Sequence, residues 1–341
     1  MKEKKNKVFK KIFSGISILL LLIIGTLIAS PFVFKDDIVK MVKEEANKSV
    51  NAKIDFGNFN LSLIKSFPDF YFSIEEIKIG GLAEFEGVPL ATIKEIDLVV
   101  DVMSVINGES ISIKRISIVE PIINTLVLAN GKANYDIAKV DSTADEQVED
   151  TTSSVPFKME LQQFEIVDAI INCDDATLPM LLTINDFDLN LKGDFTENLT
   201  NLDINGGMQQ FSLIYDGIQY MNQAKIMLDL VLEMNAEKAK YSFSENEITI
   251  NELPLGFDGW IAMPSEAIDM NLTFEAKKTD FRNILSLIPA AFAKDLEGVK
   301  TSGKLALNGF VKGTYAEENY PAFGIDLAIE NARFKYPDLP K

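Results

Sequence analysis

The sequence contains no histidine, only one cysteine and only one tryptophan. Without histidine, the chain cannot form a Ser-His-Asp triad, a Cys-His dyad or a histidine-based zinc site. The single cysteine, Cys173, excludes an internal disulfide and any metal site built from several cysteines. Because these absences exclude many common hydrolytic and metal-dependent mechanisms, we expect neither a metal nor another cofactor.

Basic residues are also scarce relative to acidic ones. The 341 residues include 33 Lys and Arg against 51 Asp and Glu, which gives a net charge of −18. Nucleic acid is therefore not an expected partner, because phosphate backbones bind basic faces. The chain is 47% hydrophobic, so it has enough apolar residues to fold, either as about two average domains or as one elongated domain.

The few basic residues are concentrated at the N-terminus. Residues 1–11 hold six lysines, and the 23 residues 12–34 carry no charge. A helix of that length reaches about 34 Å, enough to cross a hydrocarbon core of about 30 Å. We predict a cytoplasmic basic tail at 1–11 and a single membrane-spanning anchor at 12–34, with the rest of the chain outside. The residues assigned to topology are Lys4, Lys5, Lys10 and Lys11, and those assigned to the anchor are Ile16, Leu20, Ile24 and Ile28.

A cleaved signal peptide is the alternative for the same segment. The uncharged stretch is long for the apolar part of a signal peptide. Pro31 also directly follows Ser30, the best small-residue position for a cut. We therefore favour the uncleaved anchor.

From about residue 52 the apolar residues recur with a period of two. The clearest runs are 96–102, 187–192, 268–276 and 325–330. Such alternation is typical of strands with one apolar and one polar face. Asn-Gly and Asp-Gly pairs between the runs are typical of hairpin turns. The sequence therefore predicts a mainly β protein built of antiparallel meanders, with a few short helices.

Some segments depart from this pattern. We place a first β module with a leading helix at 35–138, an acidic linker or loop at 139–155, and a second β module at 156–341. A helix is predicted near 280–297, with Thr279-Asp280 as its cap. Within residues 111–118 the alternation skips one position at Lys114-Arg115, which indicates either a bulge or two separate strands.

Two stretches approximate known ligand-binding motifs. Residues 298–304 match a nucleotide-binding loop until Leu305, where the motif requires Ser or Thr. Residues 186–197 imitate a calcium loop, but Leu191 occupies the position that requires glycine. Both stretches fit turns and strands better, so neither nucleotide nor calcium is an expected ligand.

Several phrases together resemble the AsmA family of Gram-negative envelope proteins. One is the stretch 281–315, and another is 54–137 with elements such as DFGNFNLSL and NGKANYDI. The phrases NELPLGFDGWIAMP at 251–264 and YPAFGIDLAIENARFKYPDLPK at 320–341 resemble the large form found in Bacteroidetes-type bacteria. The resemblance covers nearly the whole chain after residue 34.

The resemblance implies a periplasmic protein anchored in the inner membrane by a single span. It implies a relation to bridge-like lipid transfer proteins, whose strands form an elongated, taco-shaped groove with an apolar lining. Its implied partners are phospholipid acyl chains, the inner membrane and outer-membrane assembly components, and it implies no catalytic residues. Larger family members continue past the equivalent of Lys341, so we expect this chain to be an N-terminal portion of a longer protein.

The groove candidates are the apolar residues of the cleanest alternations. They are Ile96, Leu98, Val100, Ile268, Met270, Leu272, Phe274, Leu305 and Leu307. In a closed sandwich the same residues would form an ordinary core. Three functions remain as hypotheses: lipid transfer, an interaction role in outer-membrane protein assembly, and an envelope hydrolase that uses paired acids.

Overall fold

The computed structural model describes residues 39–40, 43–44, 46–48, 50–81, 83–107, 111–138, 157–158, 161–195, 198–265, 267–285, 298–316 and 319–336. The topology and anchor residues within 1–34, the acidic segment 139–155 and most of the helix predicted near 280–297 lie outside these ranges. Among the described residues, no helix is both long enough and apolar enough to cross a bilayer.

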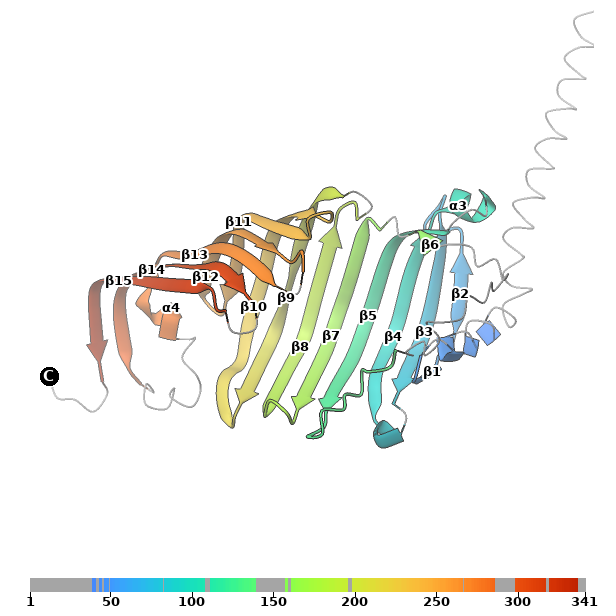
Figure 1. Cartoon of the computed structure of the whole chain (residues 1–341), viewed down its shortest axis with the longest axis horizontal. Coiled ribbons are helices and arrows are strands. Elements are labelled where there is room, and N and C mark those ends of the chain that lie inside the picture. Colours follow the sequence, from blue (N-terminus) through green and yellow to red (C-terminus); the bar gives the residue numbers. More distant parts are fainter. Residues whose placement is uncertain are drawn as a thin grey trace, which may run out of the picture.

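In the part of the chain that the structure describes, fifteen strands form a single sheet (Figure 1). The strands before the middle of the chain are β1 (Lys53–Asp55), β2 (Phe59–Ser62), β3 (Phe70–Gly80), β4 (Pro89–Val100), β5 (Ile111–Val127), β6 (Phe157–Lys158) and β7 (Gln163–Asp175). The remaining strands are β8 (Met180–Lys192), β9 (Leu199–Tyr215), β10 (Ile218–Asn235), β11 (Lys240–Ile250), β12 (Leu253–Ala262), β13 (Ile268–Asp280), β14 (Lys300–Tyr315) and β15 (Ala322–Lys335).

The helical elements are few and short. They comprise a 3-10 turn η1 (Ala83–Phe85), helix α3 (Val102–Asn107) and helix α4 (Phe281–Leu285). Residues 39–40, 43–44 and 46–48 are also helical. Asn47 joins this helical segment to β1, because its side chain accepts a hydrogen bond from the Ile54 N–H (2.9 Å) and donates one to the Ile54 carbonyl (2.8 Å).

Thirteen of the strands lie side by side in the order β1-β3-β4-β5-β7-β8-β9-β10-β11-β12-β13-β14-β15. The prediction of antiparallel meanders is confirmed for most of this sheet but is wrong at β5. Both β6 and β7 run parallel to β5. Parallel neighbours need a crossover of about a dozen residues or more, and the long segment 128–162 provides it.

The skipped alternation near Lys114 is a bulge within one strand. Val99 of β4 pairs with Arg115 of β5, whereas Val100 pairs with Ile113. Lys114 is therefore the extra residue, and β5 continues without interruption on either side of it.

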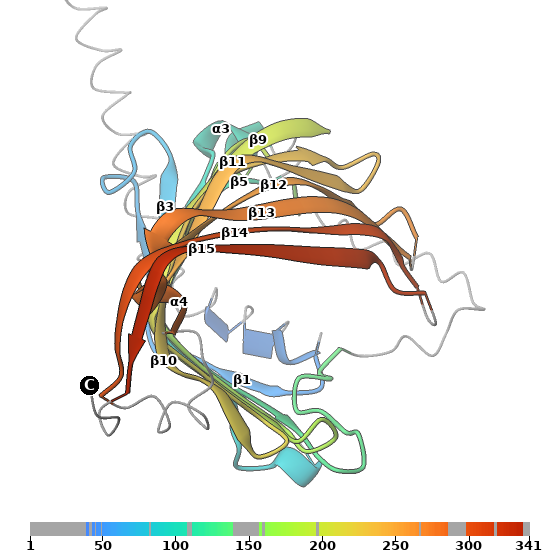
Figure 2. The ribbon, with the colours of Figure 1, turned by 90° about the vertical axis from the view of Figure 1, so that its left-hand side faces the viewer.

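The strands bend part-way along their length, so the sheet traces an open C in end view (Figure 2). At the bend, six strands carry an exposed polar residue with positive φ. These residues are Glu76, Glu120, Asp168, Asp186, Gln223 and Asn331. Positive φ interrupts the extended geometry of a strand and is uncommon outside glycine. Its recurrence on six strands of one sheet identifies the bend as a shared feature of the fold.

The bend residues of neighbouring strands lie opposite one another. Glu76 lies across from Lys94, because the flanking pairs are Glu75–Glu95 and Ile77–Ile93. Lys94 forms an ion pair with Glu120 of the next strand. The register of β5 with β7 then places Glu120 beside Asp168. Polar side chains thus follow the outside of the bend from strand to strand.

The residue after each bend residue is commonly buried. Ile77, Pro121, Ala169 and Ala224 follow bend residues on β3, β5, β7 and β10, and all four are buried. This burial indicates that the alternation shifts by one position at the bend. The shift keeps the apolar residues before and after the bend on the inner side of the sheet.

Candidate functional site

All nine predicted groove residues lie on one face of the sheet. Three belong to β4, four to β13 and two to β14. Leu272 of β13 pairs with Val311 of β14, and Leu307 of β14 pairs with Leu327 of β15. On β4, Leu98 pairs with Phe72 and with Ile116. Since paired residues point to the same side of a sheet, apolar side chains neighbour apolar side chains at both ends of the molecule.

One apolar row crosses nine strands without interruption by a charged residue. Each member is the register partner of the next, from β3 to β12. The row consists of Ile74, Ile96, Ile118, Ile166, Leu189, Gly206, Leu228, Ile248 and Leu255. An adjoining row continues through Phe257, Phe274, Gly309 and Ile325 to β15. The thirteen strands of the sheet span about 58 Å at a spacing of about 4.8 Å.

The apolar face is the concave face. Helix α4 lies on the concave side of the sheet in the end view of Figure 2 and packs against β14. Leu305, at the start of β14, is 0% exposed and shares a face with Leu307. Ala276 on the neighbouring strand β13 and Leu253 on β12 are also buried. The face that carries the predicted groove residues therefore turns toward α4 and the inside of the bend.

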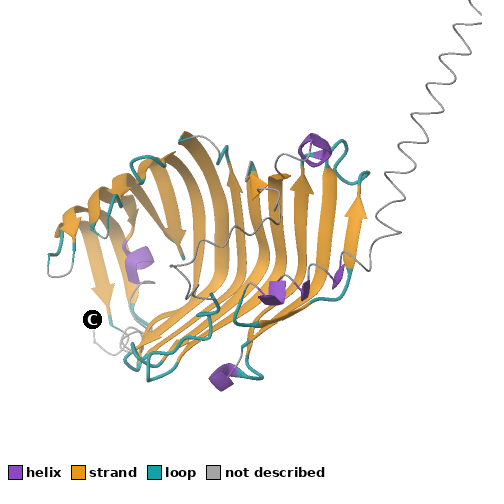
Figure 3. Cartoon of the chain, turned by 45° about the vertical axis from the view of Figure 1, so that its right-hand side comes forward, coloured by secondary structure: helices purple, strands orange, loops and turns teal. Residues whose placement is uncertain are grey.

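Most of this face is not covered by another layer. The described strands form one curved sheet, and no second sheet faces it (Figure 3). Members of the apolar row such as Ile96, Leu189 and Leu228 are only half-buried. On β15 exposure is greater still, with Ile325 at 61% and Leu327 at 51%. An apolar surface of this extent is unusual in a soluble monomer and marks a binding surface.

The convex face is polar and predominantly acidic. Asp188, Asn205, Asp229 and Glu247 alternate with members of the apolar row and are exposed. Asn271, which alternates with Leu272, pairs with Lys312 on this outer face. The two faces therefore differ in chemistry along most of the sheet, although the convex face also carries exposed apolar residues such as Met227, Val231 and Phe310.

A polar cluster on β3 and β4 is the main exception to the exposure of the convex face. Tyr71 and Ser73 are buried, and their hydroxyls donate hydrogen bonds to Asp97 (2.5 Å) and Glu95 (2.6 Å). Burial raises the pKa of Asp97, and burial together with the bond to Asp97 raises the pKa of Tyr71 above its ordinary value. The hydrogen bond from Ser73 lowers the pKa of Glu95. Lys65 lies 4.3 Å from the centre of the Tyr71 ring, so the loop before β3 covers this cluster.

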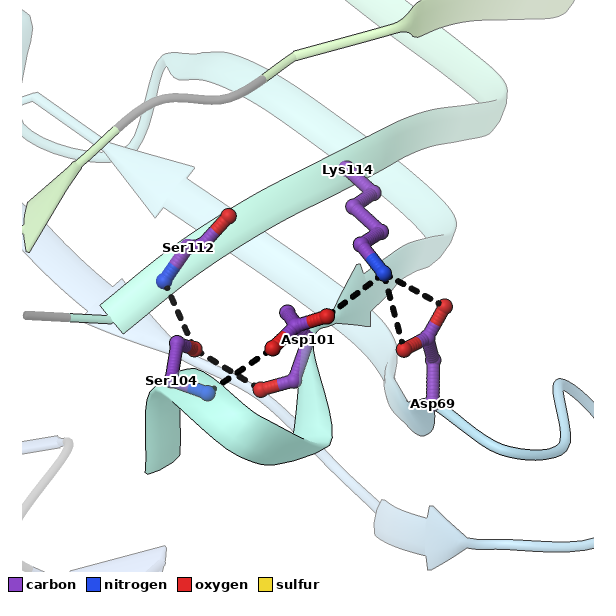
Figure 4. A network of polar contacts seen from close by, with 5 residues as sticks. All are labelled: Asp69, Asp101, Ser104, Ser112 and Lys114. Atoms are coloured by element: carbon purple, nitrogen blue, oxygen red, sulfur yellow. Dashed lines mark hydrogen bonds and ion pairs between the residues drawn. The ribbon is translucent and has the colours of Figure 1, made fainter. Parts of the chain in front are cut away.

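A second polar network joins that loop to α3 (Figure 4). The Lys114 ammonium group lies 3.0 Å from the Asp69 carboxylate and 2.6 Å from the Asp101 carboxylate. Asp101 also caps α3 by accepting a hydrogen bond from the Ser104 N–H at 2.8 Å. The bond from Lys114 lowers the pKa of Asp101 and raises the pKa of Lys114. The lysine that the bulge adds to β5 is therefore the residue that holds these two segments together.

The described region also has surface pockets that are open to solvent. Two of them measure about 580 Å³, beside Asn124, Asn172 and Leu181, and about 310 Å³, beside Phe85 and Lys132. Within the described ranges, no three acidic or cysteine side chains are placed to hold a metal ion. The concave apolar face is therefore the feature with the size and chemistry of a functional site.

Sequence reasoning missed the apolar residues beyond the bend. Ile79, Ala91, Ile123 and Ile171 form a row of register partners there. The signal was a mid-strand polar interruption that shifts the apolar period by one, as in Ile93-Lys-Glu-Ile96. The interpretation considered such a shift only at Lys114-Arg115.

A curved, mostly antiparallel sheet with a continuous apolar concave face places the protein among the elongated β-sheet proteins with an open apolar surface. The model of the AsmA family matches residues 2–286, and the chain belongs to that family. No curated protein matches the chain. No solved structure matches it either.

Proposed function

We propose that this protein is a lipid-transfer protein that shields phospholipid acyl chains during outer-membrane biogenesis. In this proposal the segment 12–34 anchors it in the inner membrane, and the β-sheet lies in the periplasm as an elongated groove. The observation that carries the proposal is the half-exposed apolar row, which continues from strand to strand along the concave face. Membership of the AsmA family is consistent with a role in envelope biogenesis or lipid transfer.

The physical need for such a surface is large. A diacyl lipid that crosses water exposes about 30 CH₂ groups, which costs about 24 kcal/mol at about 0.8 kcal/mol per group. An apolar track replaces water along the path and removes most of that cost. The proposed role is solvation, so it requires no nucleophile, metal or nucleotide.

Photocrosslinking in cells tests the proposal, and the structure provides a matched pair of positions. Leu272 lies on the concave face opposite Val311, and Asn271 lies on the convex face opposite Lys312. Both side chains are half-buried. We expect a photoreactive residue at 272 to form lipid adducts and one at 271 to form none.

Equal labelling at the two positions would show that contact with lipid is not specific to the concave face. The absence of adducts at both positions, in a protein that is folded and expressed, would overturn the lipid-transfer proposal.

An interaction role in outer-membrane protein assembly is the second candidate. It is favoured by β15, whose side chains are nearly all exposed and whose second edge has no strand partner among the described residues. Such an edge can accept a strand of another protein. Protein adducts at positions along β15, without lipid adducts at 272, would support this function instead.

A further inference from the structure

The two most exposed large apolar side chains of the described residues lie at one corner of the sheet. Phe67 is 83% exposed and Ile64 is 82% exposed, and both lie in the loop between β2 and β3. In α3, Met103 is 56% exposed and Ile106 is 59% exposed. Since Met103 and Ile106 are three residues apart on a helix, they lie on the same side of it. We refer to these four residues as the apolar corner.

The two segments of the apolar corner are held next to each other. β3 starts where β4 ends, because Phe70 pairs with Val100. The loop reaches this point at Asp69, and α3 leaves it at Asp101. Lys114 contacts both carboxylates, at 3.0 and 2.6 Å (Figure 4). The ion pairs of Lys114 with Asp69 and Asp101 therefore hold both segments of the apolar corner in place and fix the direction in which its side chains project.

These ion pairs distinguish the apolar corner from a loose surface loop. Their three side chains are shielded from solvent: Lys114 is 27% exposed, Asp69 is 16% exposed and Asp101 is 24% exposed. The apolar side chains beside them are exposed instead. That arrangement reverses the usual distribution of polar and apolar groups, and such reversals mark surfaces that meet an apolar environment.

We propose that the apolar corner inserts into the inner-membrane surface and seats the first strands of the sheet on the bilayer. The position of the predicted anchor carries this choice of partner. From residue 34 to Val50, which forms a bridge with Ala138, there are 16 residues. They reach about 24 Å as a helix, and residues 39–40, 43–44 and 46–48 within this stretch are helical. The sheet is thus tethered to the bilayer by its β1 edge.

The apolar corner and the tether lie at the same end of the sheet. β1, β2, β3 and α3 are together at one end in Figure 1, far from β15. β1 pairs with the last residues of β3, and the apolar corner adjoins its first residues. β3 has 11 residues, so the two attachment points are at most about 36 Å apart, and the bend at Glu76 brings them closer together. Two attachments would stop the sheet from swivelling on its tether and would keep one end of the concave face at the bilayer.

Electrostatics favours insertion by apolar side chains over attraction to anionic lipid. After residue 48 the chain has 46 acidic and 23 basic residues. A surface with this charge is repelled by an anionic bilayer except where apolar groups enter it. The proposal rests on the proposed function only for the identity and orientation of the anchor.

Tryptophan fluorescence with brominated lipids tests the insertion. The full-length protein would be reconstituted in vesicles of phosphatidylethanolamine and phosphatidylglycerol whose acyl chains carry bromine, which quenches tryptophan on contact. The chain has one tryptophan, Trp260, which lies opposite Asn271 on the convex face. The test variant is Phe67→Trp with Trp260→Phe, and Met103→Trp with Trp260→Phe is an independent second variant. Because both test positions are exposed, neither substitution disturbs packing.

The matched control is Leu178→Trp with Trp260→Phe, since Leu178 is 50% exposed in the turn between β7 and β8. We expect brominated lipid to remove most of the fluorescence of both test variants and to leave the control and the wild type unchanged. Equal quenching of test and control variants, or no quenching of either test variant, would overturn the insertion. Lipid adducts at 272 without quenching at 67 would retain lipid transfer and reject the membrane seat. Quenching at 67 without lipid adducts at 272 would retain the membrane seat and reject lipid transfer.

Discussion

The two ends of the sheet use the same alternating sequence pattern but are protected very differently. At the β3 end, Phe70, Tyr71, Ser73 and Ile77 are buried, with inner and outer faces both represented. At the β15 end, thirteen of the fourteen residues are exposed, and Gly324 is the exception. Alternation therefore determines which face is apolar, whereas neighbouring segments determine how much of that face meets solvent.

The difference follows from what each edge strand receives. β3 pairs with β4 on one side and with β1 and β2 on the other, and the loop before it covers Tyr71. Among the described strands, β15 pairs with β14 alone. An edge strand whose outer backbone N–H and C=O groups are unpaired and whose apolar face is exposed is a site for further strand pairing. The β3 end is thus covered by neighbouring segments, whereas the β15 end keeps the properties of an interface.

The largest expected effect separates these ends with one type of substitution. Phe70 and Phe323 each begin the apolar face of their strand, but Phe70 is 8% exposed and Phe323 is 76% exposed. We expect Phe70→Ala to lower the local free energy of opening by about 3–5 kcal/mol, because it empties a packed position. We expect Phe323→Ala to change it by less than about 0.5 kcal/mol. Hydrogen exchange measured by mass spectrometry on the full chain reports both segments.

Exchange in β3 and β4 reports the effect of Phe70→Ala, and exchange in β14 and β15 reports that of Phe323→Ala. β9 provides an internal reference within the same protein. If Phe323→Ala accelerates exchange as strongly as Phe70→Ala, then β15 is packed against a segment outside the described residues. The contrast between the two ends would then be wrong.

A smaller effect is expected from the ion pairs at the two ends. Lys114→Met leaves Asp69 and Asp101 without their shared cation in a partly shielded site. We expect a loss of about 1–3 kcal/mol in the opening free energy of β3–β5. Lys304 pairs with Asp280 at 2.6 Å, but these side chains are 55% and 67% exposed. Lys304→Met should have no measurable effect, because exposed pairs contribute little. The comparison fails if the two variants exchange alike, and Lys94→Met offers a third, exposed pair for calibration.

Alternation in the sequence was sufficient to predict the strands and the shared face of Ile96 and Leu272, because side-chain direction in a strand has a period of two. The partner of each strand was harder to predict. The parallel pairing of β5 with β7 depends on the path of a long connection, which leaves no periodic signal. The bend was missed because its residues, such as Asp168 and Asp186, are ordinary on a convex face, and because the one-position shift of the apolar period was considered only at Lys114-Arg115.

The apolar residues that make up one face of the candidate site were therefore predicted, but the curvature of that face was not predicted from the residues. Curvature emerges from the alignment of bend residues on neighbouring strands, such as Glu120 beside Asp168. No single strand contains that information. Exposure was equally inaccessible, because Leu305 and Leu327 have the same pattern in sequence but are 0% and 51% exposed.

The smallest expected effect is a pH dependence at the β3 end. The hydrogen bond from Lys114, aided by the Ser104 N–H, lowers the pKa of Asp101 below its ordinary value of 3.8. A carboxyl group whose pKa is lower in the folded state stabilises the fold above pH 3.8 and loses this contribution as the pH falls through the folded-state pKa. In Asp101→Asn the amide retains the cap of α3 but cannot titrate or pair with Lys114. We expect the wild type to melt at a higher temperature than this variant near pH 7, and the difference to shrink steadily below pH 3.8.

Asp280→Asn is the matched variant at the other end, because Lys304 lowers the pKa of Asp280 in an exposed pair. Its difference in melting temperature from the wild type should be smaller at every pH. If the difference in melting temperature for Asp101→Asn stays constant from neutral to acid pH, Asp101 acts through packing or capping alone. The ion pairs of Lys114 would then not distinguish the two ends of the sheet.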